Sequence, residues 1–414
     1  MQAVAAIEAV FRAERARVLA TTIRVTNGDF DLAEEVVQDS FAAALDRWPV
    51  EGTPDEPRAW LTSVARNKAI DAIRRRVKLR AIVDAEKIIS AESSVDAGEA
   101  AVQDDRLRLI YTCCHPALAR EAQVALTLRT LGGLTTDEIA RAFLASPTTM
   151  AQRIVRAKSK IRDARIPYEV PEASELPERT DAAMAVIYLV FNEGYAATAG
   201  DSWTRRDLSR EAIRLGRLLV ELTPANRAIH AEAEGLLALM LLHDSRRDAR
   251  SDDRGDVILL EDQERSRWDA AQIAEALPLV PLALTGSGSG PGPYALQAAI
   301  AALHAQAPRS VDTDWPQIAT LFTELLRRAP TSIVALNRAV AFAMWRGPDV
   351  GLAMIDELAE QLHDFHLFHA ARADLLRRLG RIDDAASAYR AALTLVGNEP
   401  ERRFLQRRLD SLAS

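Results

Sequence analysis

The chain has 414 residues, of which 48% are hydrophobic and 5% aromatic, so it can form two or three folded domains and lacks the composition of a disordered protein. Its formal net charge of −7 argues, taken alone, against nucleic-acid binding. The basic residues are clustered, however, so this average hides local positive surfaces. The N-terminus lacks the basic start of a signal peptide, and no apolar run approaches the roughly 20 residues that span a bilayer. We therefore expect a cytoplasmic protein with no membrane partner.

Helical periodicity runs through nearly every segment of the chain, and the helix-favouring residues Ala, Leu and Arg are plentiful. This pattern predicts an all-α fold. A polar, acidic stretch and a proline-containing connector interrupt the helical pattern. They divide the chain into a first domain at 1–82, a linker at 83–105, a second domain at 106–171 and a C-terminal domain at 180–414.

The first informative segment, residues 31–48, is amphipathic. Apolar side chains recur at helical spacing on one face: Ala33, Val37, Phe41, Ala44 and Trp48. The opposite face is polar and mostly acidic, and it consists of Asp31, Glu34, Glu35, Gln38 and Asp39. A solvated helix surface and a docking face for a basic partner both fit this pattern.

The next helical segment, residues 58–80, is strongly basic. Its polar side chains include Asn67, Lys68, Asp71, Arg74, Arg75 and Arg76. Clustered positive charge is costly through self-repulsion unless an anion relieves it, and phosphate is the natural anion. The alternative for the arginine triplet is a solubilising helix end, and we expect Trp60 to lie in the core.

Residues 134–157 carry the pattern of a helix-turn-helix. Thr135 and Glu138 have capping-box spacing, and Ser146 followed by Pro147 predicts the start of a second helix after a turn at 144–146. The exposed side of that second helix is expected to carry Thr148, Thr149, Gln152, Arg153, Arg156, Lys158 and Lys160. Its N-terminal members suit contacts with base edges and the later cations suit phosphates. A generic helical hairpin is the alternative.

The strings at 33–41, 57–76 and 134–157 resemble regions 2.2, 2.3–2.4 and 4 of bacterial sigma factors of the extracytoplasmic-function type. The resemblance implies that the acidic face at 31–39 binds core RNA polymerase. It also implies that the residues at 67–76 bind the minus-ten element of promoter DNA and that the helix after Ser146 binds the minus-thirty-five element. A free-standing regulator that binds duplex DNA and a helix-repeat adaptor are the competing functions.

The C-terminal block resembles the extension of one sigma-factor subgroup in several segments, including Phe191–Tyr195 and Leu236–Arg250. A weak repeat of about 33 residues near the end of the chain, centred on Gly347 and Gly380, predicts tetratricopeptide-like helix pairs. We expect this domain to control the sigma module through an intramolecular or external protein partner.

The adjacent Cys113 and Cys114 suit buried structural positions better than a zinc site. We expect no cofactor, no metal and no catalytic activity.

Overall fold

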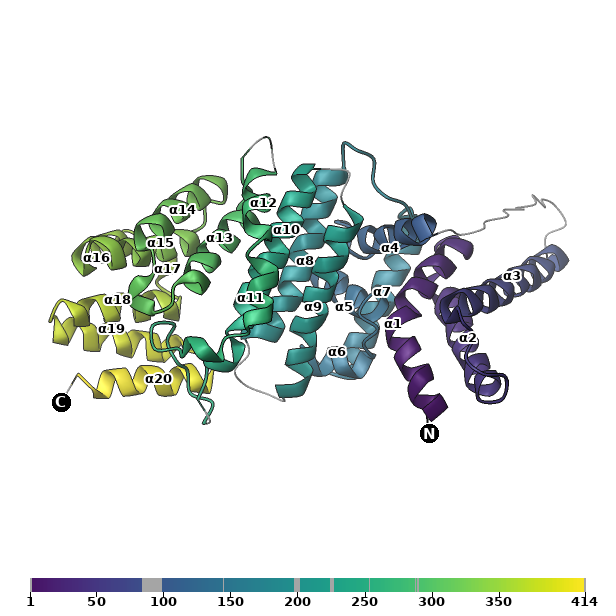
Figure 1. Ribbon diagram of the computed structural model, residues 1–414, viewed down its shortest axis with the longest axis horizontal. Helices are drawn as coiled ribbons and strands as arrows, with labels where there is room; N and C mark the ends of the chain where they lie inside the picture. The colour runs from purple at the N-terminus through teal and green to yellow at the C-terminus, as the bar shows by residue number, and fades with distance from the viewer. Residues whose placement is uncertain are drawn as a thin grey trace. The chain divides into compact units, whose positions relative to one another are not determined.

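A computed structural model describes residues 2–83, 99–143, 145–196, 202–223, 227–252, 254–286, 288 and 290–412. Over these ranges the fold is all-α, as predicted: the only β-type pairing is an isolated bridge between Ser251 and Val257. The chain divides into two compact units, Met1–Val190 and Phe191–Ser414 (Figure 1).

The first unit contains seven complete helices within the described residues and most of an eighth. They are α1 (Gln2–Val25), α2 (Phe30–Glu51), α3 (Pro57–Val83), α4 (Glu99–Cys113), α5 (Arg120–Thr130), α6 (Thr136–Ala142), α7 (Pro147–Asp163) and α8 (Leu176–Ala196). The boundary between the two units, Val190/Phe191, falls inside α8.

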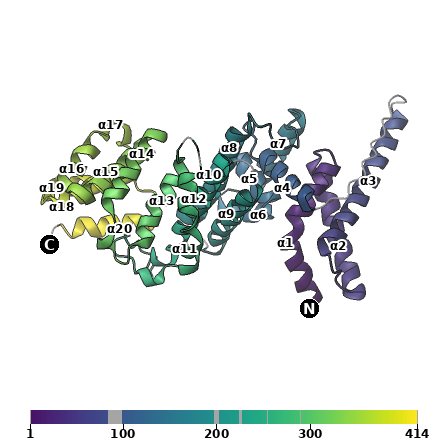
Figure 2. The same cartoon turned by 45° about the horizontal axis from the view of Figure 1, so that its top comes forward.

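Helices α1, α2 and α3 pack against one another, as both views show (Figures 1 and 2). All five apolar residues predicted for one face of the 31–48 segment are buried in α2. A small core cluster formed by Leu32, Val36 and Ala69 joins α2 to α3. Trp60 is half-buried and packs edge-to-face on Trp48, with ring centroids 5.4 Å apart. Amphipathic patterning therefore positions the polar face of α2 outwards.

Helices α5, α6 and α7 pack together, and α4 packs against both α1 and α5. Of the linker predicted at 83–105, residues 84–98 lie outside the described ranges and 99–105 form the start of α4. The proline-containing connector ends where α8 begins at Leu176, four residues before the start expected for the C-terminal domain.

The second unit begins with the end of α8 and continues through twelve further α-helices in the described residues. They are α9 (Ser202–Leu222), α10 (Arg227–Ser245), α11 (Ala270–Ala276), α12 (Leu279–Thr285), α13 (Pro293–Gln306), α14 (Trp315–Arg328), α15 (Ser332–Arg346), α16 (Pro348–Asp356), α17 (Ala359–Leu362), α18 (His366–Arg378), α19 (Ile382–Leu395) and α20 (Glu399–Asp410). Short 3-10 turns occur at Arg247–Ala249 (η1), Arg265–Arg267 (η2) and Ser310–Asp312 (η3).

Helix α10 is the centre of this unit because it packs against α9, α11, α12 and α13. Its run from Leu236 to Leu242 is completely buried, as expected of a helix that is apolar on all sides. Gly235 allows the close approach of α13: a Cβ at this position would lie 2.6 Å from the backbone nitrogen of Ala295.

The predicted repeat coincides with two helix pairs, α15 with α16 and α18 with α19. Gly347 ends α15 with φ 117°, and Gly380 follows α18 with φ 74°. Both angles lie in the region that favours glycine, so the predicted role of these glycines as helix ends is confirmed. The assignment of the unit to a tetratricopeptide-like fold stays a prediction.

Candidate polymerase and promoter interface

The helix-turn-helix forms with the predicted caps. The amide of Thr135 donates to Glu138 Oε2 at 2.7 Å, and the amide of Glu138 donates to Thr135 Oγ1 at 3.2 Å. Ser146 Oγ accepts from the Thr149 amide at 3.1 Å, and Pro147 occupies the first turn of α7. Reciprocal capping satisfies backbone donors that a helix start leaves free, so both helix starts are fixed locally. Residue 144 of the turn lies outside the described ranges.

Helix α7 buries one face and exposes the other. The buried residues are the four predicted ones, Met150, Ile154, Ala157 and Ile161. Among the predicted DNA contacts, Thr148, Thr149, Gln152, Arg156 and Lys160 are exposed and Arg153 is half-buried. Thr149 also lies 2.8 Å, hydroxyl to hydroxyl, from Ser146 at the helix cap. An exposed, cationic face of this kind can reach the edges of bases and phosphate oxygens.

Lys158 differs from the other predicted DNA contacts because it faces α2. Its ammonium lies 3.0 Å from Asp31 Oδ1 and 3.1 Å from Glu34 Oε2, and its side chain is 11% exposed. Asp31 and Glu34 belong to the face predicted to bind polymerase. The structure therefore brings one predicted DNA contact and two predicted polymerase contacts together in one ion-pair cluster.

The rest of the acidic face of α2 is more open. Glu35 and Gln38 are exposed, and neither has a hydrogen-bond or ion-pair partner in the part of the chain that the structure describes. Asp39 accepts from Lys68 of α3 at 3.1 Å, with both side chains about half exposed. A pair this exposed is weak, so a partner of higher charge can displace it at little cost.

The basic side of α3 lies beside α2. Arg76 donates to Asp29, the N-cap residue of α2, at 2.7 Å. Asn67, Asp71, Arg74 and Arg75 are exposed. Two cations of α3, Lys68 and Arg76, thus pair with acidic side chains of α2 and its cap, while the other predicted minus-ten residues are open to solvent.

Three further contacts tie α1 to the helix-turn-helix half of the unit. Arg24 forms an ion pair with the buried Asp105 of α4 at 2.8 Å. The Tyr168 hydroxyl lies 2.9 Å from the carbonyl oxygens of both Ala20 and Asp105, and Arg15 donates to the carbonyl of Arg129 at 3.1 Å. Burial raises the pKa of Asp105, although the hydrogen bond from Arg24 opposes the shift. Local sequence patterns do not predict these contacts, because their partners lie 63 to 148 residues apart.

Cys113 and Cys114, at the end of α4, are buried and form no disulfide, as expected of structural cysteines. Burial raises the pKa of Cys114 to about 11 and that of Cys113 further, so both are thiols at neutral pH. Within the described ranges no three His, Cys, Asp or Glu side chains come close enough together to hold a metal ion.

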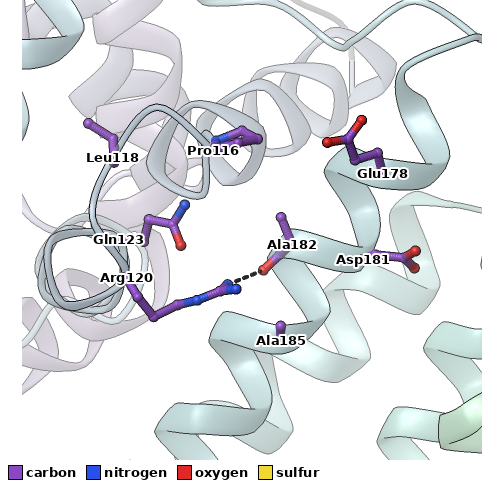
Figure 3. Close-up of a pocket in the computed structure, with 8 residues that line it drawn as sticks. All are labelled: Pro116, Leu118, Arg120, Gln123, Glu178, Asp181, Ala182 and Ala185. Carbon is purple, nitrogen blue, oxygen red and sulfur yellow. Dashed lines mark hydrogen bonds between the residues drawn. The ribbon is translucent and has the colours of Figure 1, made fainter. Parts of the chain in front are cut away.

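The first part of α8 packs on this region. The Tyr111 and Thr180 hydroxyls form a buried hydrogen bond of 2.7 Å, and Arg179 donates to the Tyr111 carbonyl at 2.7 Å. A cavity of about 500 Å³ lies beside these contacts (Figure 3). Its lining residues are Pro116, Leu118, Arg120, Gln123, Glu178, Asp181, Ala182 and Ala185. Arg120 reaches across to the Ala182 carbonyl at 3.5 Å.

Three stretches of the chain match known families. Residues 10–78 match sigma-70 region 2, and residues 108–161 match sigma-70 region 4. The chain belongs to the sigma-70 family. Residues 179–284 match a family of unknown function, DUF6596. The region 2 and region 4 matches, taken with this stretch, are those of an extracytoplasmic-function sigma factor with a C-terminal extension.

A related protein has the same overall extent. The sigma factor is 44% identical over 391 residues to an uncharacterized protein of Rhizobium meliloti (strain 1021), covering 93% of its own length and 91% of that protein. Sigma-70 regions 2 and 4 give the chain a role in transcription initiation, and the family contains non-enzymatic initiation factors. Among the described residues, no helix is both long and apolar enough to cross a membrane.

Proposed function

We propose that this sigma factor binds core RNA polymerase through the acidic face of α2 and confers promoter-specific initiation through α3 and α7. The observation that carries the proposal is the pairing of matches: region 2 contains an outward acidic face, and region 4 contains a doubly capped helix-turn-helix with an exposed cationic helix. Neither match alone distinguishes a sigma factor from a duplex-binding regulator.

Each predicted site has a distinct role in this proposal. Asp31, Glu34, Glu35, Gln38 and Asp39 contact polymerase, where complementary charge sets the register and speeds association. The residues at 67–76 hold the opened minus-ten strand by contacts with its phosphates and an unstacked base. On α7, Thr148, Thr149, Gln152 and Arg153 read the minus-thirty-five element, and Arg156, Lys158 and Lys160 bind its phosphates.

The ion pairs of Lys158 add a requirement to this scheme. Lys158 competes with polymerase cations for Asp31 and above all for the largely buried Glu34, and its 11% exposed side chain is not available to a phosphate while it holds them. Assembly on polymerase therefore exchanges the α2–α7 contact for contacts with polymerase and DNA. In the same scheme the C-terminal extension regulates the sigma module, through a protein partner or within the chain.

The test is reconstitution with purified core polymerase. The full chain and core polymerase together are incubated with a random-sequence DNA pool, and strand opening is mapped on the selected fragments with a probe for unpaired thymine. We expect selection and opening only when both proteins are present. Selection of a specific duplex by the chain alone, with no binding to polymerase, would instead identify a free-standing regulator.

A charge reversal on α2 separates polymerase binding from folding. Glu35→Lys should weaken core binding, because Glu35 is exposed and has no partner in the described residues. Asp46→Lys is the matched control: it makes the same charge change on the same side of the same helix, about three turns beyond Glu35 and past the predicted contact residues at 31–39. If the two variants bind core polymerase equally well, the acidic face of α2 is not the polymerase-binding surface.

A further inference from the structure

The second unit contains a guanidinium group that is shielded from solvent and has no hydrogen-bond partner among the described residues. Arg265, in the η2 turn, stacks on the indole of Trp268 with its guanidinium carbon 4.0 Å from the ring centroid. Its three guanidinium nitrogens are shielded from solvent and have no hydrogen-bond acceptor within the described residues. Arginine remains charged in proteins and its donors form strong hydrogen bonds with anions, so leaving all of them unmade is costly.

The surroundings of Arg265 are positive rather than negative. Arg246, directly after α10, is close enough that its charge, in addition to burial, lowers the pKa of Arg265. Burial and the charges of Arg246 and Arg265 lower the pKa of His304, in the last turn of α13, to about 4. His243, in the last turn of α10, also has its pKa lowered well below the usual range, chiefly by burial, and Arg246 lies 3.3 Å from its Nδ1. Both imidazoles are therefore neutral at neutral pH.

The nearby acidic side chains are committed elsewhere. Asp244 accepts from Arg247 and from Gln272, and Glu264 accepts from Ser266. Within the described ranges, neither Arg246 nor Arg265 forms an ion pair. The carbonyls at a helix end can stabilise Arg246, which follows α10, but Arg265 donates to none of them. The cluster thus carries two fixed positive charges with no counter-charge from the described chain.

We propose that Arg246 and Arg265, together with the imidazoles of His243 and His304, form a binding site for a small oxyanion, namely the phosphate or carboxylate group of a metabolite. Guanidinium groups match such oxyanions in geometry and charge, and a neutral imidazole supplies one further N–H donor. Residues Arg246 and Arg265 lie within the stretch that matches DUF6596. The site predicts that this extension binds a small oxyanion. This proposal is independent of how the sigma module acts.

The test measures the melting temperature of the full chain in chloride, inorganic phosphate and malonate at equal ionic strength, which separates site binding from general screening. Titration calorimetry then gives the dissociation constant of each stabilising anion. A shift with phosphate alone identifies a phosphorylated ligand, and a shift with malonate alone identifies a carboxylic acid. Shifts with both show the shared oxyanion chemistry, so each of these three results supports the site.

Two methionine variants make the test specific. Arg265→Met keeps an apolar contact with Trp268 but removes the donors, and it should weaken anion binding by at least about tenfold, the value of one charged hydrogen bond. Arg267→Met changes an exposed arginine of the same turn and should bind like the unmodified chain. In chloride alone, Arg265→Met should melt at or above the temperature of the unmodified chain, because an uncompensated charge has been removed.

A purely structural arginine gives the opposite pattern. Arg265→Met would then melt below the unmodified chain in chloride, and any anion shift would be the same in both variants. That result, or the absence of any shift with either anion up to about 10 mM, overturns the proposal. Arg246→Gln provides a second variant, which should lose the anion shift while keeping the stacking of Arg265 on Trp268.

Discussion

Replacing Lys158 with methionine should raise the affinity of the sigma factor for core polymerase measured without DNA. Lys158 is the cation that holds Asp31 and Glu34, two of the side chains proposed to bind polymerase. Methionine has a similar length and can keep the apolar contacts of the lysine stem while it removes the charge. The variant therefore weakens the α2–α7 contact and leaves the acidic face of α2 intact.

The size of the effect depends on burial. Asp31 is 68% exposed, so its ion pair contributes at most about 1 kcal/mol. Glu34 is 13% exposed, and a hydrogen bond between charged groups in such a site contributes about 1.5–3 kcal/mol. Loss of both should destabilise the α2–α7 contact by about 2 kcal/mol, which raises the apparent affinity for polymerase up to about thirtyfold.

The assay is a fluorescence titration of labelled core polymerase with each variant. Lys160→Met is the matched control, because Lys160 lies on the same helix but is exposed and has no partner among the described side chains. Labels at Glu35→Cys and Gln152→Cys report the α2–α7 separation independently, since the two native thiols are buried. If Lys158→Met and Lys160→Met bind polymerase equally and leave the label separation unchanged, the ion pairs do not restrain the acidic face.

Arg153→Ala should reduce discrimination for the minus-thirty-five sequence by about 1–3 kcal/mol, whereas Arg156→Ala should weaken binding to all sequences alike and lower its salt dependence; competition between selected and random duplexes measures both. Thr135→Ala should cost about 1 kcal/mol in the free energy of unfolding by urea, because the amide of Glu138 loses its cap; no change would show that the box is redundant. His304→Gln should flatten the pH dependence of stability between about pH 6.5 and 4. In the unmodified chain, the folded state binds a proton at His304 more weakly than the unfolded state does. The free energy of unfolding is therefore highest above pH 6.5, and about 3 kcal/mol of it is lost as the pH falls to 4. If the free energy of unfolding falls equally with pH in the variant and in the unmodified chain, the low pKa of His304 is contradicted.

Local patterns predicted the elements of the sigma module well. The buried face of α2, the capping box at Thr135 and the cap at Ser146 all depend on residues within a few positions of one another. Helix periodicity and capping are local properties, so a single sequence is enough to find them.

Contacts across long sequence separations could not be predicted in this way. Lys158 fits a phosphate contact by its spacing on α7, and only the folded chain places it on Asp31, 127 residues away. The same reason hid the positive cluster around Arg265. Its members come from the ends of α10 and α13 and from a short turn, and each residue looks ordinary in its own segment.

The position of α8 affects how a shortened gene should be designed and read. The sequence pattern predicts that the sigma module ends at residue 171, yet the Tyr111 hydroxyl in the helix-turn-helix half bonds to Thr180. A stop codon placed after residue 171 would remove that partner, and the lost hydrogen bond alone would cost about 0.5–1.5 kcal/mol. Loss of transcription in such a strain would report damaged folding as readily as lost regulation. A stop codon after Val190 keeps this bond, so that allele is the one whose phenotype can be attributed to the extension.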